Sequence, residues 1–211
     1  MSADMNQENA NVIDDMKENR KAVRKKRSPV SIVIELLIYA FIVFFCLSIF
    51  PTYIMERTVV SGESMEDTLH HNESLLVNKL SYRFGDPERY DIIVFRPKGQ
   101  NVDEYYVKRI YGLPGETIYI DKNSIYVNGE KVDDPYAKDA MDDDLIEIGT
   151  PDKPYTLKEN EYYVLGDHRS VSMDSRYSPE SDEDAPGPVK RENIVGKVFI
   201  RIWPLNKFGT P

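Results

Sequence analysis

Residues 60–69 have the sequence VSGESMEDTL, which overlaps the end of a short strand-like run, Thr58–Val60. Gly62 frees the backbone for a tight turn, because glycine adopts conformations that other residues avoid. Met65 would place an apolar wall beside Ser64. A serine in a glycine-containing loop is most often part of a turn. The stretch alone leaves two interpretations open: a simple turn, or a loop that presents Ser64 as a nucleophile.

An apolar segment of membrane length lies upstream of this loop. Residues 30–50 contain one charged residue, Glu35, and as a helix they would rise about 31 Å, which matches the core of a bilayer. No small-x-small pattern follows, as a cleaved signal peptide would require, and no polar face marks a buried soluble helix. We therefore expect one transmembrane helix over residues 29–50.

A basic cluster precedes the apolar segment and indicates its orientation. Residues 17–27 carry seven lysines and arginines against one acid, Glu18, after a polar stretch, residues 1–16, without a hydrophobic period. Positive residues gather on the cytoplasmic side of membrane helices. We expect residues 1–28 to form a cytoplasmic tail and residues 51–211 to form an extracytoplasmic domain.

The composition argues against several other classes of protein. The 211 residues carry a net charge of −9 with a pI near 4.9, whereas a nucleic-acid partner would need a basic patch. The single cysteine, Cys46, permits no intramolecular disulfide. Three histidines and this cysteine show no metal-ligand spacing, and we expect neither a metal nor a cofactor. No histidine is well placed beside the Ser64 motif, so a Ser/His/Asp triad is not indicated, although it stays open.

From residue 51 onward the sequence predicts a mainly β domain. Short runs of β-branched and aromatic residues alternate with turn residues. The expected strands are Thr58–Val60, Ser74–Val77, Asp91–Phe95, Tyr105–Ile110, Thr117–Ile120, Ser124–Val127, Glu130–Val132, Tyr162–Leu165 and Ile194–Ile202. Asn128-Gly129 predicts a two-residue hairpin turn. We expect an antiparallel, barrel-like β domain with an insert at about residues 133–160 and an acidic loop over Pro179–Pro186.

A second informative stretch, YYVKRIYGLPGE, spans residues 105–116. On a strand, Lys108 shares a face with Tyr106 and Ile110, while Arg109 lies on the other face. If the Lys108 face is inward, burial lowers the pKa of the amine, and a neutral amine can take a proton from a serine hydroxyl. The alternative interpretation is an outward lysine that guards an edge strand.

A third stretch, GDHRSVSMDSR, spans residues 166–176 and follows an apolar run. Asp174 and Arg176 could form an ion pair in it, and one of its serines could hydrogen-bond a buried amine. The alternative interpretation is a polar turn without a chemical role.

These three motifs, in this order after one transmembrane helix, resemble the type I signal peptidases, which are membrane-bound serine proteases with a Ser/Lys dyad. The resemblance covers residues 50–205, including Asn193–Val198 and Trp203–Leu205. The single anchor and short insert are more similar to the Gram-positive subgroup. The resemblance implies a signal-peptidase β fold at the cell membrane. It also implies an endopeptidase that removes signal peptides from exported preproteins after small residues, in an Ala-x-Ala-like pattern.

The resemblance also implies a role for individual residues, carried over by motif position. Ser64 would attack the scissile carbonyl, and Lys108 would act as general base and then as general acid. Ser172 would orient the Lys108 amine, and Asp174 would pair with Arg176 to hold that wall of the site.

The resemblance further implies how the substrate and the oxyanion are held. The backbone N–H of Ser64 would form the oxyanion hole without a side-chain donor, because Gly62 occupies the position where some members carry a hydroxyl. The candidate pocket walls are Val60, Met65, Leu69, Tyr106 and Val107.

Three features depart from the family pattern. Asp67 stands where proline is usual, His168 stands where asparagine is usual, and residues 178–186 are an apparent insertion. If Asp67 faces the site, its charge would favour the protonated form of Lys108 and slow the reaction.

Two other functions stay open. The first is another Ser/Lys peptidase on the same β scaffold, such as a self-cleaving repressor, which the transmembrane helix and the absence of a DNA-binding segment disfavour. The second is an inactive, membrane-tethered homologue that binds peptides. It predicts that Lys108 is charged or displaced from Ser64.

Overall fold

The computed structural model describes residues 28–49, 53–97 and 104–211. The chain divides into two units, Met1–Ser48 and Ile49–Pro211. Apart from Ser28, the expected cytoplasmic tail lies outside the described residues.

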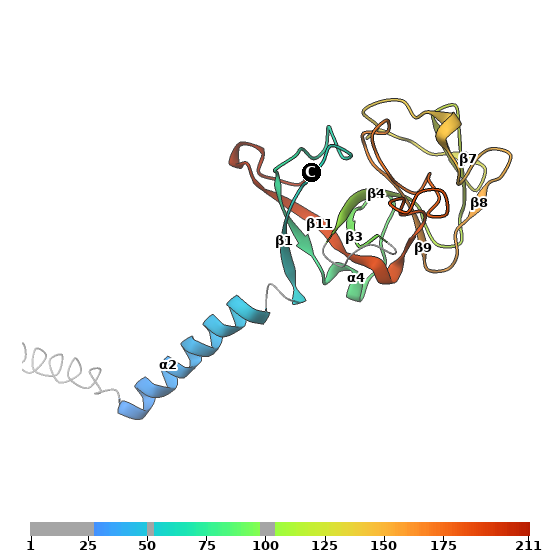
Figure 1. The fold of residues 1–211 in the computed structure, drawn as a ribbon. Coiled ribbons are helices and arrows are strands. Elements are labelled where there is room, and N and C mark those ends of the chain that lie inside the picture. The colour runs from blue at the N-terminus through green and yellow to red at the C-terminus, as the bar shows by residue number, and fades with distance from the viewer. Residues whose placement is uncertain (1–27, 50–52, 98–103) are drawn as a thin grey trace, which may run out of the picture. The chain divides into compact units, whose positions relative to one another are not determined.

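The first unit contains one apolar helix, α2 (Pro29–Phe44), which continues into a turn of π-helix, η1 (Phe45–Ile49). Ser28 caps the helix by accepting a hydrogen bond from Ser31 N, and Pro29 occupies the first turn, where a missing N–H costs nothing. The helical stretch Pro29–Ser48 is long and apolar enough to cross a membrane (Figure 1). None of the residues of α2 is buried, which leaves its apolar surface available to lipid.

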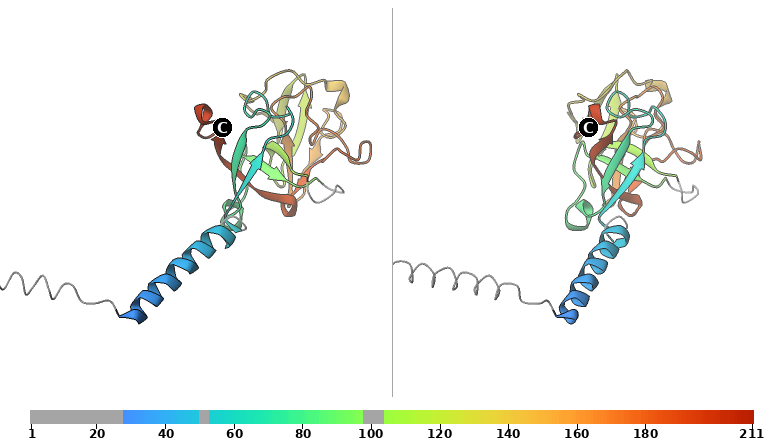
Figure 2. Two further views of the ribbon diagram at one scale, coloured as in Figure 1. Left: turned by 60° about the vertical axis from the view of Figure 1, so that its left-hand side comes forward. Right: turned by 90° about the vertical axis from the view of Figure 1, so that its left-hand side faces the viewer.

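The second unit is mainly β, and its larger sheet has seven antiparallel strands in the order β1-β2-β11-β3-β4-β9-β10. The strands are β1 (Met55–Val59), β2 (Ser74–Asn78), β3 (Ile92–Phe95), β4 (Tyr106–Gly112), β9 (Glu161–Leu165), β10 (Val189–Lys190) and β11 (Ile194–Trp203). The sheet curls on itself, as the views in Figures 1 and 2 show. The helical pieces of this sheet region are short and include α4 (Ser81–Phe84), η3 (Arg191–Asn193) and η4 (Leu205–Lys207).

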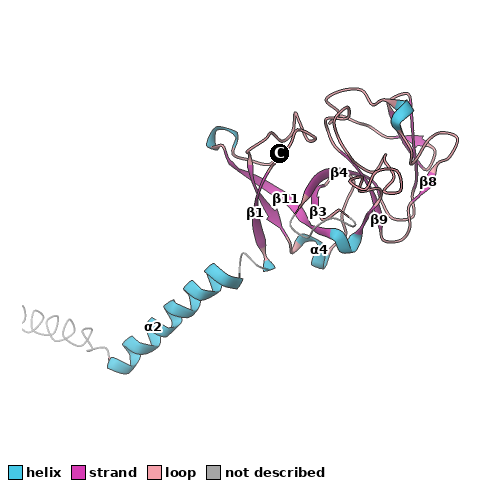
Figure 3. Cartoon of the chain, in the orientation of Figure 1, coloured by secondary structure: helices cyan, strands magenta, loops and turns pink. Residues whose placement is uncertain are grey.

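A smaller antiparallel sheet has the order β7-β6-β5-β8. Its strands are β5 (Thr117–Asp121), β6 (Ser124–Val127), β7 (Glu130–Lys131) and β8 (Tyr155–Thr156). Asn128 and Gly129 have φ values of 53° and 84° between β6 and β7, so the predicted two-residue turn is confirmed. Between β7 and β8 the chain is mostly loop around a short 3₁₀ turn, η2 (Asp143–Leu145) (Figure 3).

The middle of the larger sheet is buried on both faces. Along β3, Ile92 and Val94 pack into one hydrophobic cluster, while Ile93 and Phe95 pack into another. The next strand, β4, lies between β3 and β9, and it pairs Lys108 with Ile93 and Arg109 with Ile92. The alternative that Lys108 guards an edge strand is therefore wrong.

The predicted fold class, a mainly β domain with an antiparallel, barrel-like sheet after one apolar helix, is confirmed. Each expected strand is present, with ends that differ by at most three residues. Two strands were not predicted, β8 and β10. Each is two residues long, which is too short to produce an alternating pattern.

Close contact between β11 and β2 requires glycine at position 196. A Cβ atom there would lie 2.5 Å from Asn78 O and 2.9 Å from a Val77 methyl carbon.

We expect Gly196→Ala to lower the free energy of unfolding by about 1–3 kcal/mol, because the strands must separate. Thermal unfolding of the full chain in detergent tests this, with Gly85→Ala as the control, since its new methyl would meet only Ser81 O at 3.6 Å. Equal unfolding temperatures for the two variants would contradict the prediction.

Candidate functional site

Ser64 lies in a closed loop between β1 and β2. Two backbone hydrogen bonds form the neck of the loop, from Val60 N to Glu73 O (2.9 Å) and from Asn72 N to Val60 O (2.9 Å). Met65 is almost fully buried in a hydrophobic cluster and anchors the loop beside the serine. Gly62 has a φ of 99°, a conformation that suits glycine. The loop therefore presents Ser64 from an anchored position.

The Lys108 amine reaches Ser64 from the central strand β4. Its Nζ atom lies 2.7 Å from Ser64 Oγ, and only 4% of the residue is exposed. The pKa of Lys108 is lowered to about 8, mainly by burial and to a lesser extent by the charge of Arg176, while the charges of Asp174 and Asp167 oppose the shift. A useful fraction of this amine is therefore neutral near neutral pH, as a general base requires.

The third stretch, residues 166–176, forms a buried polar wall beside the dyad. Arg176 donates to both carboxylate oxygens of Asp174, at 2.8 and 3.0 Å, as predicted for this pair. Asp174 also accepts a hydrogen bond from Gly166 N at 3.0 Å. The Asp174 carboxylate thus links Gly166, at the start of residues 166–176, to Arg176 at their end.

Ser172 lies in this wall, but its hydroxyl does not contact Lys108. It is the one buried side-chain polar atom among the described residues that has no hydrogen-bond partner. A Cβ on Gly166 would lie 2.2 Å from Ser172 Oγ and 2.4 Å from Ser64 O, so Ser172 borders the loop of the nucleophile. The expected contact from Ser172 to the Lys108 amine is not formed in this structure.

Polar contacts tie the Ser64 loop to the third stretch. His168 N donates to Ser64 O at 3.1 Å, and the His168 ring nitrogen Nδ1 lies 3.2 Å from Glu63 O. Asp167 accepts two hydrogen bonds from Arg109, at 3.0 and 2.7 Å, and one from the Thr68 hydroxyl at 2.5 Å. Because Arg109 neighbours Lys108, the same contacts hold the serine loop and the lysine strand together.

A groove of about 790 Å³ passes over Ser64 and Lys108. Four of the five predicted pocket residues line it, namely Val60, Met65, Tyr106 and Val107. The fifth, Leu69, does not: its side chain is completely buried in the core, where it anchors the serine loop.

Sequence reasoning missed other residues that line the groove. Val171 and Met173 flank Ser172 and face the groove, while Ser172 is buried. The alternation of apolar and polar residues at 171–173 was the signal that could have identified them.

Asp67 does not act on the dyad. Its side chain is 77% exposed and lies 3.7 Å from Lys138, which also forms an ion pair with Glu66 at 2.8 Å. The charges that shift the pKa of Lys108 come from other residues.

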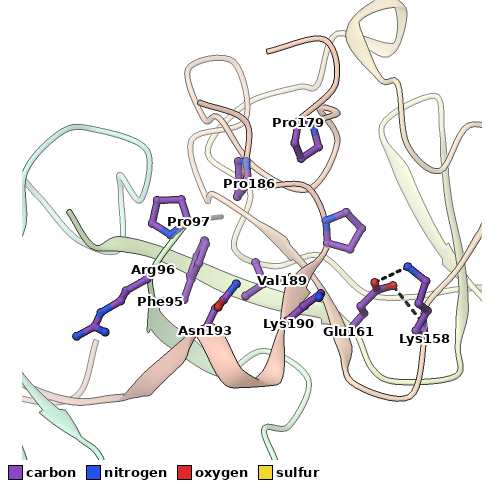
Figure 4. A pocket seen from close by; sticks show the side chains of 11 residues that line it. Phe95, Arg96, Pro97, Lys158, Glu161, Pro179, Pro186, Val189, Lys190 and Asn193 are labelled. Atoms are coloured by element: carbon purple, nitrogen blue, oxygen red, sulfur yellow. Dashed lines mark hydrogen bonds and ion pairs between the residues drawn. The ribbon is translucent and has the colours of Figure 1, made fainter. Parts of the chain in front are cut away.

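A second, smaller cavity of about 250 Å³ lies beside β9 and β10, among four prolines. Figure 4 shows Lys158 and Glu161 paired at one side of it. Neither Ser64 nor Lys108 lines this cavity. Across the described ranges, no group of three or more histidine, cysteine, aspartate or glutamate side chains could hold a metal ion.

The chain is similar to known proteins over most of its length. The family model described as "Signal peptidase, peptidase S26" matches residues 32–203. Signal peptidase I of Bacillus caldolyticus is 41% identical over 166 residues, which cover 74% of this chain and 84% of that protein. A probable signal peptidase I-2 of Synechocystis is 36% identical over a match that covers 75% of this chain and 67% of that protein. Signal peptidase I P of Bacillus subtilis subsp. natto is 35% identical over a match that covers 89% of this chain and 96% of that protein.

The buried lysine should reduce the stability of the fold. A fall in the pKa of Lys108 from 10.5 to about 8 means that the unfolded chain binds this proton more tightly than the folded chain. At about 1.4 kcal/mol per pKa unit, we expect Lys108→Met to raise the free energy of unfolding by up to about 3 kcal/mol at pH 7. The gain should shrink as the pH rises from 8, where the folded chain loses the proton, to 10.5, where the unfolded chain loses it too.

Unfolding of the full chain in detergent at pH 7 and pH 10 measures this effect. Lys190→Met is the control, because the Lys190 side chain is 42% exposed and its removal relieves no buried charge. A stability gain for Lys108→Met that is the same at both pH values would contradict the assigned pKa.

Proposed function

The chain belongs to the signal peptidase family, peptidase S26, and from this premise we propose that it is a serine endopeptidase with a Ser64/Lys108 dyad. The observation that carries the proposal is the 2.7 Å contact between Lys108 Nζ and Ser64 Oγ, made by an amine that is buried and has a lowered pKa. A nucleophile and a base within hydrogen-bond reach are the minimum for this chemistry.

In the proposed mechanism, the neutral amine of Lys108 takes the proton of the Ser64 hydroxyl as the oxygen attacks the scissile carbonyl carbon. The backbone N–H of Ser64 stabilises the oxyanion. The C–N bond then breaks, and the Lys108 ammonium gives its proton to the leaving amine. A water molecule, deprotonated by Lys108, hydrolyses the acyl-enzyme and restores Ser64.

The supporting residues would act on the position and charge of Lys108. The Asp174–Arg176 pair places opposite charges near the amine, so their effects on its pKa partly cancel. Ser172 would orient the amine with its buried hydroxyl, which borders the Ser64 loop and has no other hydrogen-bond partner in the described part of the chain.

We propose that the substrate is the cleavage region of a signal peptide. A peptide bound in the groove would be extended, with alternate side chains facing the walls. Bulky walls from Val60, Met65, Tyr106 and Val107 support a preference for small residues before the scissile bond, in an Ala-x-Ala-like pattern.

We also propose that α2 anchors the enzyme in the cell membrane, with residues 1–28 in the cytoplasm and the β unit outside. The apolar length of the helix and the basic residues before it support this orientation. The preproteins would then meet the enzyme as they leave the bilayer.

The alternative of an inactive peptide-binding homologue finds no support in the position of Lys108, and Asp67, which suggested it, faces solvent.

Two substitutions test the dyad in a cleavage assay with a synthetic Ala-x-Ala signal peptide in detergent. Ser64→Ala should lower cleavage at least about 10³-fold, because no nucleophile remains. Lys108→Arg should be equally inactive, because a guanidinium stays protonated and cannot accept the serine proton.

The matched control is Lys190→Arg, an exposed lysine far along the chain from both motifs, which should cleave at the wild-type rate. Wild-type cleavage by Ser64→Ala would show that another residue is the nucleophile, and an active Lys108→Arg would exclude Lys108 as the base.

A further inference from the structure

The segment after β11 folds back along its own strand. Arg201 N donates to Gly209 O at 2.8 Å, and Gly209 N donates to Arg201 O at 3.2 Å, so residues 204–209 form a closed turn around η4. We call residues 204–209 the clasp. The clasp lies beyond residue 203, where the match to the family model ends.

The clasp and β11 together hold a buried carboxylate of the serine loop. The side chain of Glu73 is only 4% exposed, and it accepts hydrogen bonds from Arg201 Nη1 at 2.8 Å and from Lys207 Nζ at 3.0 Å. Burial opposes the charged form of Glu73, but the hydrogen bonds from the two cations hold its pKa below the ordinary value. A charged group buried in this way is costly unless its partners stay in place.

Arg201 forms hydrogen bonds with the Ser64 loop at two separate points. The same Nη1 atom that contacts Glu73 at the neck also donates to Thr68 O at 3.1 Å, and Nε donates to Lys207 O in the clasp at 2.8 Å. The Thr68 hydroxyl in turn contacts Asp167 at 2.5 Å. One guanidinium therefore connects the clasp to the middle of the Ser64 loop at Thr68 and to its neck at Glu73.

We propose that Arg201 and Lys207 are positioning residues, and that the clasp holds the Ser64 loop so that the hydroxyl stays within reach of Lys108. This proposal rests on the proposed peptidase function. Reaction rates fall steeply when a nucleophile moves by about 1 Å, so loosening the loop should lower kcat more than it changes KM.

The chain offers a matched pair of variants for the test. Lys207 and Lys197 are each 40% exposed, and each pairs with a carboxylate that is largely buried, Glu73 and Asp91 respectively. Lys197 lies on β11 and does not contact the Ser64 loop in the described structure. Replacing either exposed lysine by methionine should leave the chain folded.

We expect Lys207→Met to lower kcat about 10-fold with KM changed less than about twofold, while Lys197→Met keeps both within about twofold. Arg201→Lys should also lower kcat at least about 10-fold, because one ammonium group cannot reproduce the contacts with Glu73, Thr68 and Lys207. Hydrogen exchange of peptides covering residues 60–73 should be faster in both variants than in the wild type or Lys197→Met. Unfolding temperatures of all four proteins establish that the differences are local.

Unchanged kcat and unchanged exchange over residues 60–73 in Lys207→Met would overturn the clasp proposal, as would an equal loss in Lys197→Met. If the wild type itself cleaves no signal peptide, the proposed function fails, and the exchange comparison still decides whether the clasp holds the loop. If Arg201→Lys does not fold, Lys207→Met alone decides.

Discussion

Burial of one amine beside one hydroxyl is the constraint on which the site depends. A lysine at the centre of a sheet is unfavourable for folding, because the charged form loses its hydration. The sheet imposes this environment because β4 has neighbours on both sides and packed clusters on both faces. The loop that carries Ser64 is then anchored by Met65 and Leu69 in the same core. The lowered pKa and the 2.7 Å contact thus have one structural origin.

Paired charges surround this lysine, whose pKa is lowered. Arg109 pairs with Asp167 and Arg176 pairs with Asp174, and all four side chains are buried. Breaking such a pair by removing one partner leaves an uncompensated buried charge, so these pairs resist local rearrangement. They connect the lysine strand, the third stretch and the serine loop. The arrangement keeps strong charges near Lys108 while their effects on its pKa partly cancel.

Much of this could be predicted from the sequence, because the signals were local. Alternation predicted the long strands, Asn128-Gly129 predicted the hairpin, and the three motifs predicted that Lys108 lies within reach of Ser64. The burial of both Lys108 and Arg109 could not be predicted, since alternation says that two neighbours face opposite ways and not that both faces are covered. The positions of Leu69, Asp67 and the Ser172 hydroxyl depend on packing between segments distant in the chain. The same is true of the contacts from Arg201 to Glu73 and Thr68.

The pKa of Lys108 in the folded chain is the quantity that tests this account most directly. It can be measured by NMR titration of the full chain in detergent with isotope-labelled lysine, where the Lys108 signal is the one absent from a Lys108-substituted protein. The account predicts a midpoint near pH 8, well below those of the exposed lysines. A midpoint near the ordinary value of 10.5 would leave almost no neutral amine at neutral pH, and it would contradict the role of this residue as the base.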